Sequence, residues 1–335
     1  PQAESYARRS LPLLKGVVQS GIDLYANSLN TLATALGLQF RTAEAEVVYR
    51  ELLDRQIQRY SPDHYLIGRA WNNYSLVLIS QGKYQAAEAA LTEALRIAKK
   101  NPDATGVGMA LYNLGALHHE AGQLQQASQA LDASLDIWRS SNGRWAPLVT
   151  MLIEKSATLR DLGQLQAAQA TFDEAERVAS EKLEPGHPRH GSVLQERGTL
   201  RLAHGDLDGA HKDLQEARNL LEQQGNLERV AYTRVYLGEV ALRSDQIEVA
   251  RTEFSAALAT RRKIFPVGHW SIADAQSRLG NALCLSGDHA QGVAMMSDAL
   301  RDLRASRPAG DSVSRAAERR LQSATTPDAA GDARQ

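Results

Sequence analysis

The sequence predicts an all-α protein in which short helical hairpins are stacked in a row. The clearest sign is an alanine that returns every 40 to 42 residues, at Ala87, Ala127, Ala168, Ala210 and Ala250. Five residues before each of them stands a glycine or, once, an aspartate, as expected for a turn. A period near 40 residues is typical of arrays of small units that pack on their neighbours and offer a long surface to a partner.

Length and composition agree with such an array. A chain of 335 residues is too long for one ordinary core, whereas stacked units avoid that limit because each packs only on its neighbours. Hydrophobic residues make up 43 % and aromatic residues 5 %, which favours helices packed at close range. With 38 basic and 39 acidic side chains, the net charge of −1 gives no long-range attraction to nucleic acid, so we predict no nucleic-acid partner.

Each copy is expected to form two antiparallel helices, A and B, because apolar residues recur at three- and four-residue intervals on both sides of the turn. Small residues on helix A and the alanines on helix B would let two backbones approach closely. The helix A glycines are Gly115, Gly198, Gly238 and Gly280. A large residue four positions after each alanine should fill the space toward the next unit; these are Leu91, Leu131, Phe172, Leu214, Phe254 and Met296.

The pattern divides the chain into four parts. Residues 1–25 are expected to form an extra helix, which could belong to a preceding repeat, and residues 26–305 form the array. Its first copy is weaker and contains Gly37 at the turn, followed by Phe40, Ala43 and Val47. A capping helix that Asp311 could start covers the open end within residues 306–322, and residues 323–335 form a disordered tail.

These copies resemble tetratricopeptide repeats (TPRs), in which a small residue on helix A precedes a Gly-x-Tyr turn and an Ala and a large residue on helix B. The clearest copy reads Gly82-Lys83-Tyr84, then Ala87, Leu91 and Ala94. Three connectors, Ser61–His64, Glu184–Pro188 and Phe265–His269, resemble those of the long-period kinesin-light-chain-like class. The resemblance implies a right-handed superhelical solenoid of about seven units, from a bacterial source.

The same resemblance implies that one face of each helix A lines a concave groove that binds a partner. Asparagine can donate to and accept from an extended peptide backbone, and tyrosine supplies flat area with one polar tip. The alternative is that any helix carries polar residues on its free face. The expected groove residues are Arg69, Asn72, Asn73, Tyr112, Asn113, His119, Glu154, Gln195, Tyr232, Tyr236, Arg278 and Asn281.

No motif in the chain predicts catalysis, a cofactor or a metal. His118-His119-Glu120 does not match the helical zinc motif, since that motif needs two histidines four residues apart on one face. A chaperone-tail clamp is not expected either, because Asn73 and Asn113 lack the flanking lysines of that TPR subclass. We therefore expect no enzyme in this chain.

The sequence thus predicts a non-catalytic scaffold that binds a peptide or protein segment in its groove. The alternative is the C-terminal sensory or docking region of a larger bacterial signalling protein, such as a Ser/Thr kinase or a transcription regulator. The start at Pro1 rather than Met favours that alternative. No apolar run reaches the roughly 20 residues that span a bilayer, so we predict no membrane insertion. We expect a cytoplasmic location, with the periplasmic part of an anchored protein as the alternative; self-association stays open.

Overall fold

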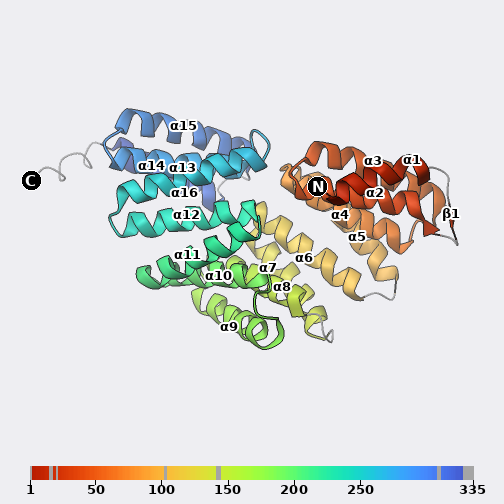
Figure 1. Ribbon diagram of the computed structural model, residues 1–335. Helices are drawn as coiled ribbons and strands as arrows, with labels where there is room; N and C mark the ends of the chain where they lie inside the picture. The colour runs from red at the N-terminus through yellow and green to blue at the C-terminus, as the bar shows by residue number, and fades with distance from the viewer. Residues whose placement is uncertain are drawn as a thin grey trace, which may run out of the picture. The chain divides into compact units, whose positions relative to one another are not determined.

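The computed structural model describes residues 2–14, 18–19, 22–101, 104–140, 145–307 and 311–326 (Figure 1). The elements in chain order are α1 (Gln2–Leu14), β1 (Val18–Gln19), β2 (Ile22–Asp23), α2 (Leu24–Leu38), α3 (Thr42–Arg59), α4 (Tyr65–Ser80), α5 (Tyr84–Lys100), α6 (Ala104–Glu120), α7 (Leu124–Arg139), α8 (Trp145–Asp161), α9 (Leu165–Lys182), α10 (Arg189–His204), α11 (Leu207–Gln223), α12 (Leu227–Arg243), α13 (Ile247–Ile264), α14 (Trp270–Leu285), α15 (His289–Ser306) and α16 (Ser312–Thr325). Apart from the two-residue antiparallel strands β1 and β2, every regular element of the described ranges is helical, which confirms the all-α class.

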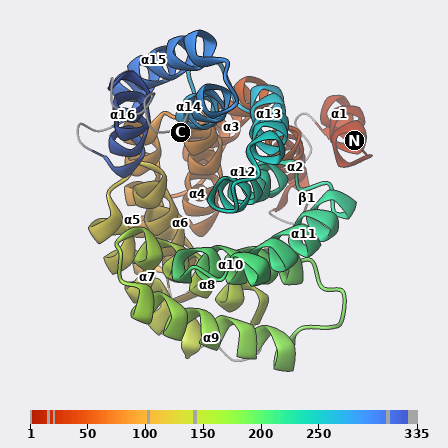
Figure 2. The same ribbon diagram turned by 90° about the vertical axis from the view of Figure 1, so that its left-hand side faces the viewer.

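The chain falls into two compact units. The first contains residues 1–120 and 129–141, and the second contains residues 121–128 and 142–335. In the first unit α2 pairs with α3 and α4 with α5, while α6 packs beside α5. In the second unit the pairs are α8 with α9, α10 with α11, α12 with α13, and α14 with α15. Within each unit, successive helices lie alongside one another in both ribbon views (Figures 1 and 2).

The recurrent alanines lie in the interior of the protein. Ala87, Ala127, Ala168, Ala210 and Ala250 are all completely buried, as the pattern predicts. In the α10–α11 hairpin, a Cβ on Gly198 would come within 3.3 Å of the Ala210 carbonyl oxygen. The two backbones can therefore approach closely, because one helix has a glycine and the other an alanine at the contact.

The large residue after each alanine has a wider role than the sequence predicts. Leu214, Phe254 and Met296 are buried and belong to the layer between hairpins, but they also press on helix A of their own hairpin. A Cβ on Gly198 would lie 2.7 Å from Cγ of Leu214, and a Cβ on Gly280 would lie 2.8 Å from Cγ of Met296. The helix A glycines are thus the sockets that receive these side chains.

The first copy of the array has a different register from the predicted one. Gly37 lies inside α2, and the residue with a left-handed backbone is Phe40, with φ of 59°. Counting five residues on from Phe40 gives Ala45, which is completely buried, whereas the predicted Ala43 and Val47 are exposed. The prediction of Gly37, Ala43 and Val47 is therefore wrong, because a non-glycine residue adopts the turn conformation that usually selects glycine.

The connectors build the start of the next helix A. Tyr60 stacks on His64 with ring centroids 4.1 Å apart, and Phe265 stacks on His269 at 4.2 Å. Each histidine then accepts a hydrogen bond from the backbone N–H two residues on, in Leu66 and in Ser271. The histidine of each of these two connectors therefore caps the next helix, and the preceding aromatic ring stacks against it.

The ends of the array differ in detail from the expected boundaries. Within residues 1–25, α1 covers Gln2–Leu14 and packs against α2, which begins at Leu24. At the other end, the Asp311 side chain accepts bonds from the N–H groups of Val313 and Ser314 and caps α16, which packs on α14 and α15. The helix continues to Thr325. Most of the predicted tail, residues 327–335, lies outside the described residues.

Candidate functional site

Three of the predicted groove residues of the first unit line a cavity of about 280 Å³. Arg69, Asn72 and Asn73 from α4 line one side, and Met109 and neighbouring small residues of α6 line the other. The C-terminal half of α5 closes the floor with Ala94, Ile97, Ala98 and Asn101. We call this cavity the α4–α6 pocket; it is a gap between two successive helices A at their N-terminal ends.

Small residues open this pocket. Gly68 on α4 adds no side chain to the lining and lets α5 approach closely, since a Cβ there would meet Cγ2 of Ile97 at 3.0 Å. Thr105, Gly106 and Ala110 keep the facing side of α6 equally low. Apolar walls and a polar rim at one end are the usual composition of a site that receives a side chain or small group.

Beside the pocket, four asparagine side chains form a continuous chain of hydrogen bonds across three helices. Nδ2 of Asn113 on α6 donates to Oδ1 of Asn72 on α4 at 2.9 Å, and Nδ2 of Asn72 donates to Oδ1 of Asn73 at 3.4 Å. Nδ2 of Asn73 in turn donates to Oδ1 of Asn30 on α2 at 3.3 Å. We call this set the asparagine ladder. It orients each amide, and it leaves the second N–H of the amide groups free for another acceptor.

The ladder includes one residue that the sequence reasoning missed. The predicted groove begins at Arg69 and includes no residue of the first copy, so Asn30 was not predicted. Aligned on Phe40, Asn30 stands ten residues before the turn, where Asn72 stands relative to Gly82. Asn113, in contrast, was predicted as a contact residue but is only 2 % exposed, so it supports the ladder from behind.

Arg69 is the cation of the α4–α6 pocket. Its side chain is exposed, and among the residues that the structure describes it makes no hydrogen bond or ion pair. Arg96 on α5 shows the contrast, since it pairs with Asp63 at 2.5 Å and with Glu93 at 2.7 Å. Among the described residues, the lining contains no acidic side chain, and Arg69 gives it a positive charge.

Tyr112 and His119 extend the same face of α6. Both are half-buried, and each takes part in an interaction within the protein. Neither lines the pocket. They therefore lie further along the helix A surface that the sequence predicts as a groove.

In the second unit, the predicted residues are largely held by internal charges. Oε1 of Gln195 accepts from Arg229 at 3.1 Å, and Gln195 is buried. Arg261 lies 5.0 Å above the Tyr232 ring. Arg278 pairs with Glu239 and also with Asp274 at 2.9 Å. Glu154 and Asn281 are half-buried, and Glu154 has a partner within the protein.

A buried network links α8, α10 and α12 of this unit. Nη1 of Arg160 donates to Oε2 of Glu196 at 2.9 Å, and Nη2 donates to the Tyr236 hydroxyl at 3.3 Å. Glu196 also accepts from Ser156 at 2.9 Å and from Thr199 at 3.0 Å. Burial raises the pKa of Glu196, while Arg160 and the two hydroxyl groups oppose that rise. No local pattern in the sequence predicts this network, because Arg160 lies 36 residues from Glu196 and 76 residues from Tyr236.

A second cluster, on α13, α14 and α16, carries more cations than anions. Burial opposes the ionisation of Asp274, yet Arg278 and Arg261 hold the pKa of its carboxyl well below the usual range. Arg320 on α16 donates to Ser277 at 3.0 Å, and burial together with Arg278 lowers its pKa to about 10. The charged residues of this face therefore bind one another and fix the stack of helices A.

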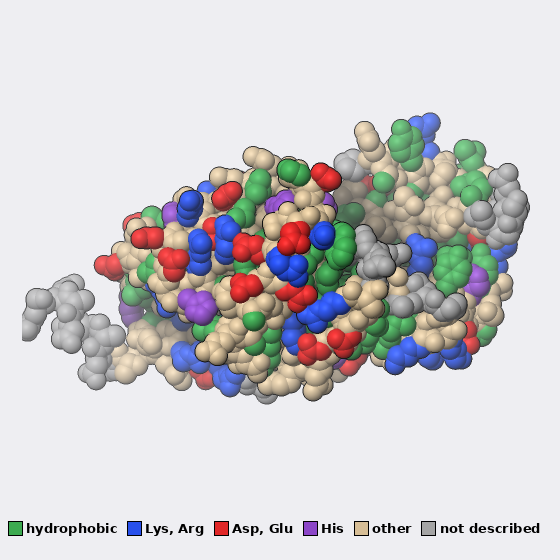
Figure 3. All heavy atoms as spheres, turned by 90° about the horizontal axis from the view of Figure 1, so that it is seen from below, with side chains coloured by type: hydrophobic (Ala, Val, Ile, Leu, Met, Phe, Trp, Pro, Cys, Tyr) green, Lys and Arg blue, Asp and Glu red, His purple; other side chains and the backbone are tan. Residues whose placement is uncertain are grey.

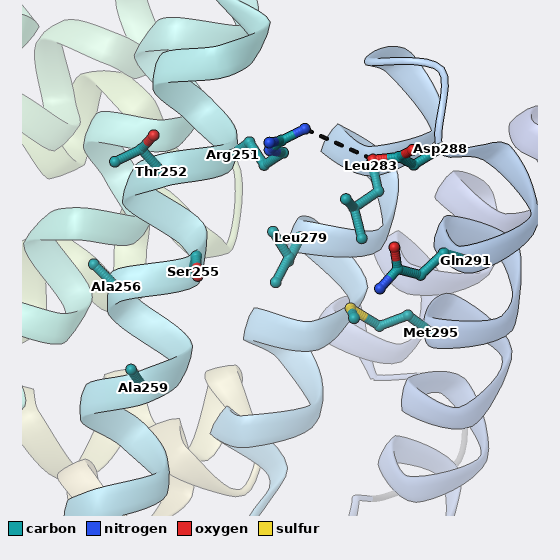
Figure 4. Close-up of a pocket in the computed structure, with 10 residues that line it drawn as sticks. All are labelled: Arg251, Thr252, Ser255, Ala256, Ala259, Leu279, Leu283, Asp288, Gln291 and Met295. Atoms are coloured by element: carbon teal, nitrogen blue, oxygen red, sulfur yellow. Dashed lines mark ion pairs between the residues drawn. The ribbon is translucent and has the colours of Figure 1, made fainter.

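A larger cavity of about 590 Å³ lies between α13 and α15, with α14 as its floor (Figure 4). Thr252, Ser255, Ala256 and Ala259 form a low ridge along α13, and Leu279 and Leu283 point toward them from α14. Two residues of its lining, Arg251 and Asp288, form an ion pair at 3.7 Å. None of the predicted groove residues lines it.

The described ranges contain neither a metal-binding cluster nor a membrane-spanning helix. No group of three or more His, Cys, Asp or Glu side chains there could hold a metal ion. In the same ranges, no helix combines the length and apolar character that a membrane span requires. On the face drawn in Figure 3, basic and acidic side chains are largely interspersed rather than gathered by sign.

Comparison with solved structures shows the same fold in proteins of low sequence identity. The apo form of RapI has a TM-score of 0.63 and 16 % identity, over 78 % of this chain and 90 % of that one. A Rap protein complexed with competence and sporulation factor has a TM-score of 0.64 and 13 % identity, over 96 % and 92 %. At these identities the likeness concerns the fold alone.

Among curated proteins, the mitochondrial tetratricopeptide repeat protein 19 homolog of Drosophila melanogaster is 29 % identical over 109 residues, which is 32 % of this chain. The Tonsoku-like protein of Mus musculus is 26 % identical over 185 residues, or 52 % of this chain. The matches span only 30 % and 14 % of those relatives' own lengths. The family model of a tetratricopeptide repeat matches residues 24–100, and that of the MalT-like TPR region matches residues 75–322, well over half of the chain. The chain therefore belongs to the MalT-like TPR family.

Proposed function

We propose that this chain is a non-catalytic scaffold that binds an extended peptide or protein segment along the helix A face of its first unit. The observation that carries the proposal is the asparagine ladder beside the α4–α6 pocket. Partly exposed amides in a fixed row can donate to and accept from successive peptide groups, which present the same two functions along an extended chain.

Pre-organisation supports this assignment. Because each amide of the ladder is already oriented by the next, a peptide would not have to immobilise several freely rotating side chains on binding. The solved relatives add fold-level support, since one was crystallised with competence and sporulation factor and another, Cut9–Hcn1, is a hetero-tetramer. On the helix A face of the second unit, fewer polar groups are available to a partner, because they bind each other.

A selection from a random peptide library on the intact chain tests the proposal. The enriched peptides should bind Asn72→Ala/Asn73→Ala about tenfold more weakly than the parent, because two hydrogen-bonding groups are removed. Fluorescence anisotropy measures both affinities. The matched control, Gln85→Ala/Glu88→Ala, changes two exposed residues of α5 and should bind as the parent does. If no peptides are enriched, or if the groove variant and the parent bind them equally well, the proposal that the groove binds a peptide is wrong.

The alternative context is a docking or sensory region of a larger bacterial signalling protein. The favouring observation is that the curated relatives are longer than the segment they share with this chain. The gene upstream of Pro1 decides this: an open reading frame that encodes a signalling domain supports it, and a start codon directly before Pro1 contradicts it.

A further inference from the structure

We infer that the α4–α6 pocket selects a peptide residue with an acidic side chain, and that Arg69 is the residue that reads it. The inference rests on the proposed function, because the asparagine ladder would hold the peptide backbone while the pocket receives one side chain. The occupant is therefore an extended segment with an Asp or Glu at one position.

Size is the first argument. A cavity of about 280 Å³ lies at the lower limit of the volumes that hold a drug-sized ligand or cofactor. It therefore suits a single side chain. Its opening lies next to Asn72 and Asn73, which both line it, so a peptide bound to those amides would direct a side chain inward.

Charge is the second argument. Among the described residues of the lining, Arg69 is the one that carries a charge, and it makes no ion pair or hydrogen bond with any of them. An arginine can take a carboxylate through two parallel N–H···O bonds, which gives geometric selectivity as well as energy. A basic side chain would meet a like charge there, and an apolar one would leave the guanidinium without a counterion.

The walls are the third argument. Ile97, Met109 and the alanines of α5 and α6 contact the stem of an entering side chain but offer it no charge. Asn101 is occupied, since Nδ2 donates to the carbonyl oxygens of Asp63 and Ile97. The lining thus combines apolar side chains with one arginine. This combination suits the methylene stem and carboxylate of glutamate better than the shorter side chain of aspartate.

The test is a parallel selection of random peptides on the intact parent chain, on Arg69→Glu and on Arg9→Glu. Arg9 is an exposed residue of α1, so its reversal changes the net charge equally. Parent and Arg9→Glu should enrich an acidic residue at one position, and Arg69→Glu should enrich Lys or Arg there. The best parent peptide with that acid changed to Lys should lose tenfold or more on the parent and regain it on Arg69→Glu.

The outcomes separate the two proposals. Peptides that require Asn72 and Asn73 but show the same preference on the parent and on Arg69→Glu overturn the role of Arg69 and leave the groove intact. If peptide binding is unchanged by substitutions in the ladder and at residue 69, both proposals are wrong. The same holds if no peptide is enriched on any of the chains.

Discussion

Asn113 on α6 donates its side-chain N–H to Oδ1 of Asn72 on α4 over 2.9 Å, joining residues that are 41 positions apart in the chain. The bond ties the buried end of the asparagine ladder to its partly exposed members. A repeat protein has contacts only between neighbouring units, so a polar bond of this kind also fixes the register of one helix A against the next.

Replacing Asn113 by Asp should therefore destabilise the first unit. The carboxylate keeps the size of the amide but cannot donate, and it would lie buried opposite the acceptor oxygen of Asn72. We expect a loss of about 1–3 kcal/mol in the free energy of unfolding by urea. Asn27→Asp, at an exposed position near the start of α2, is the control and should change stability little. Equal stability of the two variants would mean that the ladder bond contributes nothing.

Gly280 tests the close approach of helices A and B in the last hairpin. A Cβ there would lie 2.8 Å from the backbone carbonyl oxygen of Gly292, which cannot move aside like a side chain. Gly280→Ala should cost about 1–3 kcal/mol although alanine favours a helix. Gly37→Ala, whose new Cβ would meet only Val77 at 3.7 Å, should instead stabilise the chain by up to about 1 kcal/mol. Thermal or urea unfolding of both variants decides whether the glycine is a packing requirement.

His269 should make the second unit lose stability in mild acid. Burial, together with Arg261 and Arg307, lowers its pKa to about 4 from an ordinary value of 6.5. Because the folded state binds this proton more weakly than the unfolded state, its contribution is complete above pH 6.5 and is lost as the pH falls toward 4. Between pH 7.5 and pH 5 the loss should be about 2 kcal/mol.

The variant His269→Asn isolates that effect. Asparagine can still accept at the helix N-terminus but does not titrate, so its stability should be lower at pH 7.5 and should fall less on acidification. Urea unfolding of both proteins at the two pH values measures the difference. The same loss between pH 7.5 and pH 5 in both would assign the acid sensitivity to other groups.

Arg160 should be structural rather than a contact for a ligand. Arg160→Met would leave the Glu196 carboxylate buried beside two hydroxyl groups, at a cost of about 3–5 kcal/mol. In Arg160→Met/Glu196→Met the uncompensated charge is gone, and much of that stability should return. Denaturation of the parent, the single and the double variant forms the test. A double variant as unstable as the single one would contradict the assignment.

The sequence by itself determined the kind of molecule. Its alanine period, turn residues and three-to-four spacing specify stacked hairpins, because only the smallest residues fit where helices A and B cross, as Ala210 and Gly198 do. It also indicated Arg69, Asn72 and Asn73, since position within helix A follows from the distance to the turn glycine. The shift in the first copy, from Gly37 to Phe40, arose because backbone conformation rather than residue type defines the turn.

Only the tertiary structure decided which polar residues are available to a partner. Twelve side chains are predicted for the groove face of helix A, yet Asn113 and Gln195 are buried, and Tyr236 and Arg278 are bound to charges on neighbouring helices. Arg69, in contrast, has no hydrogen bond or ion pair to another described residue. The position of a residue in the repeat predicts the direction in which its side chain points. Whether that side chain is hydrogen-bonded depends on a second atom within about 3 Å, which belongs to a residue some 40 positions away in the chain. That distance is set by packing, which no local pattern in the sequence expresses.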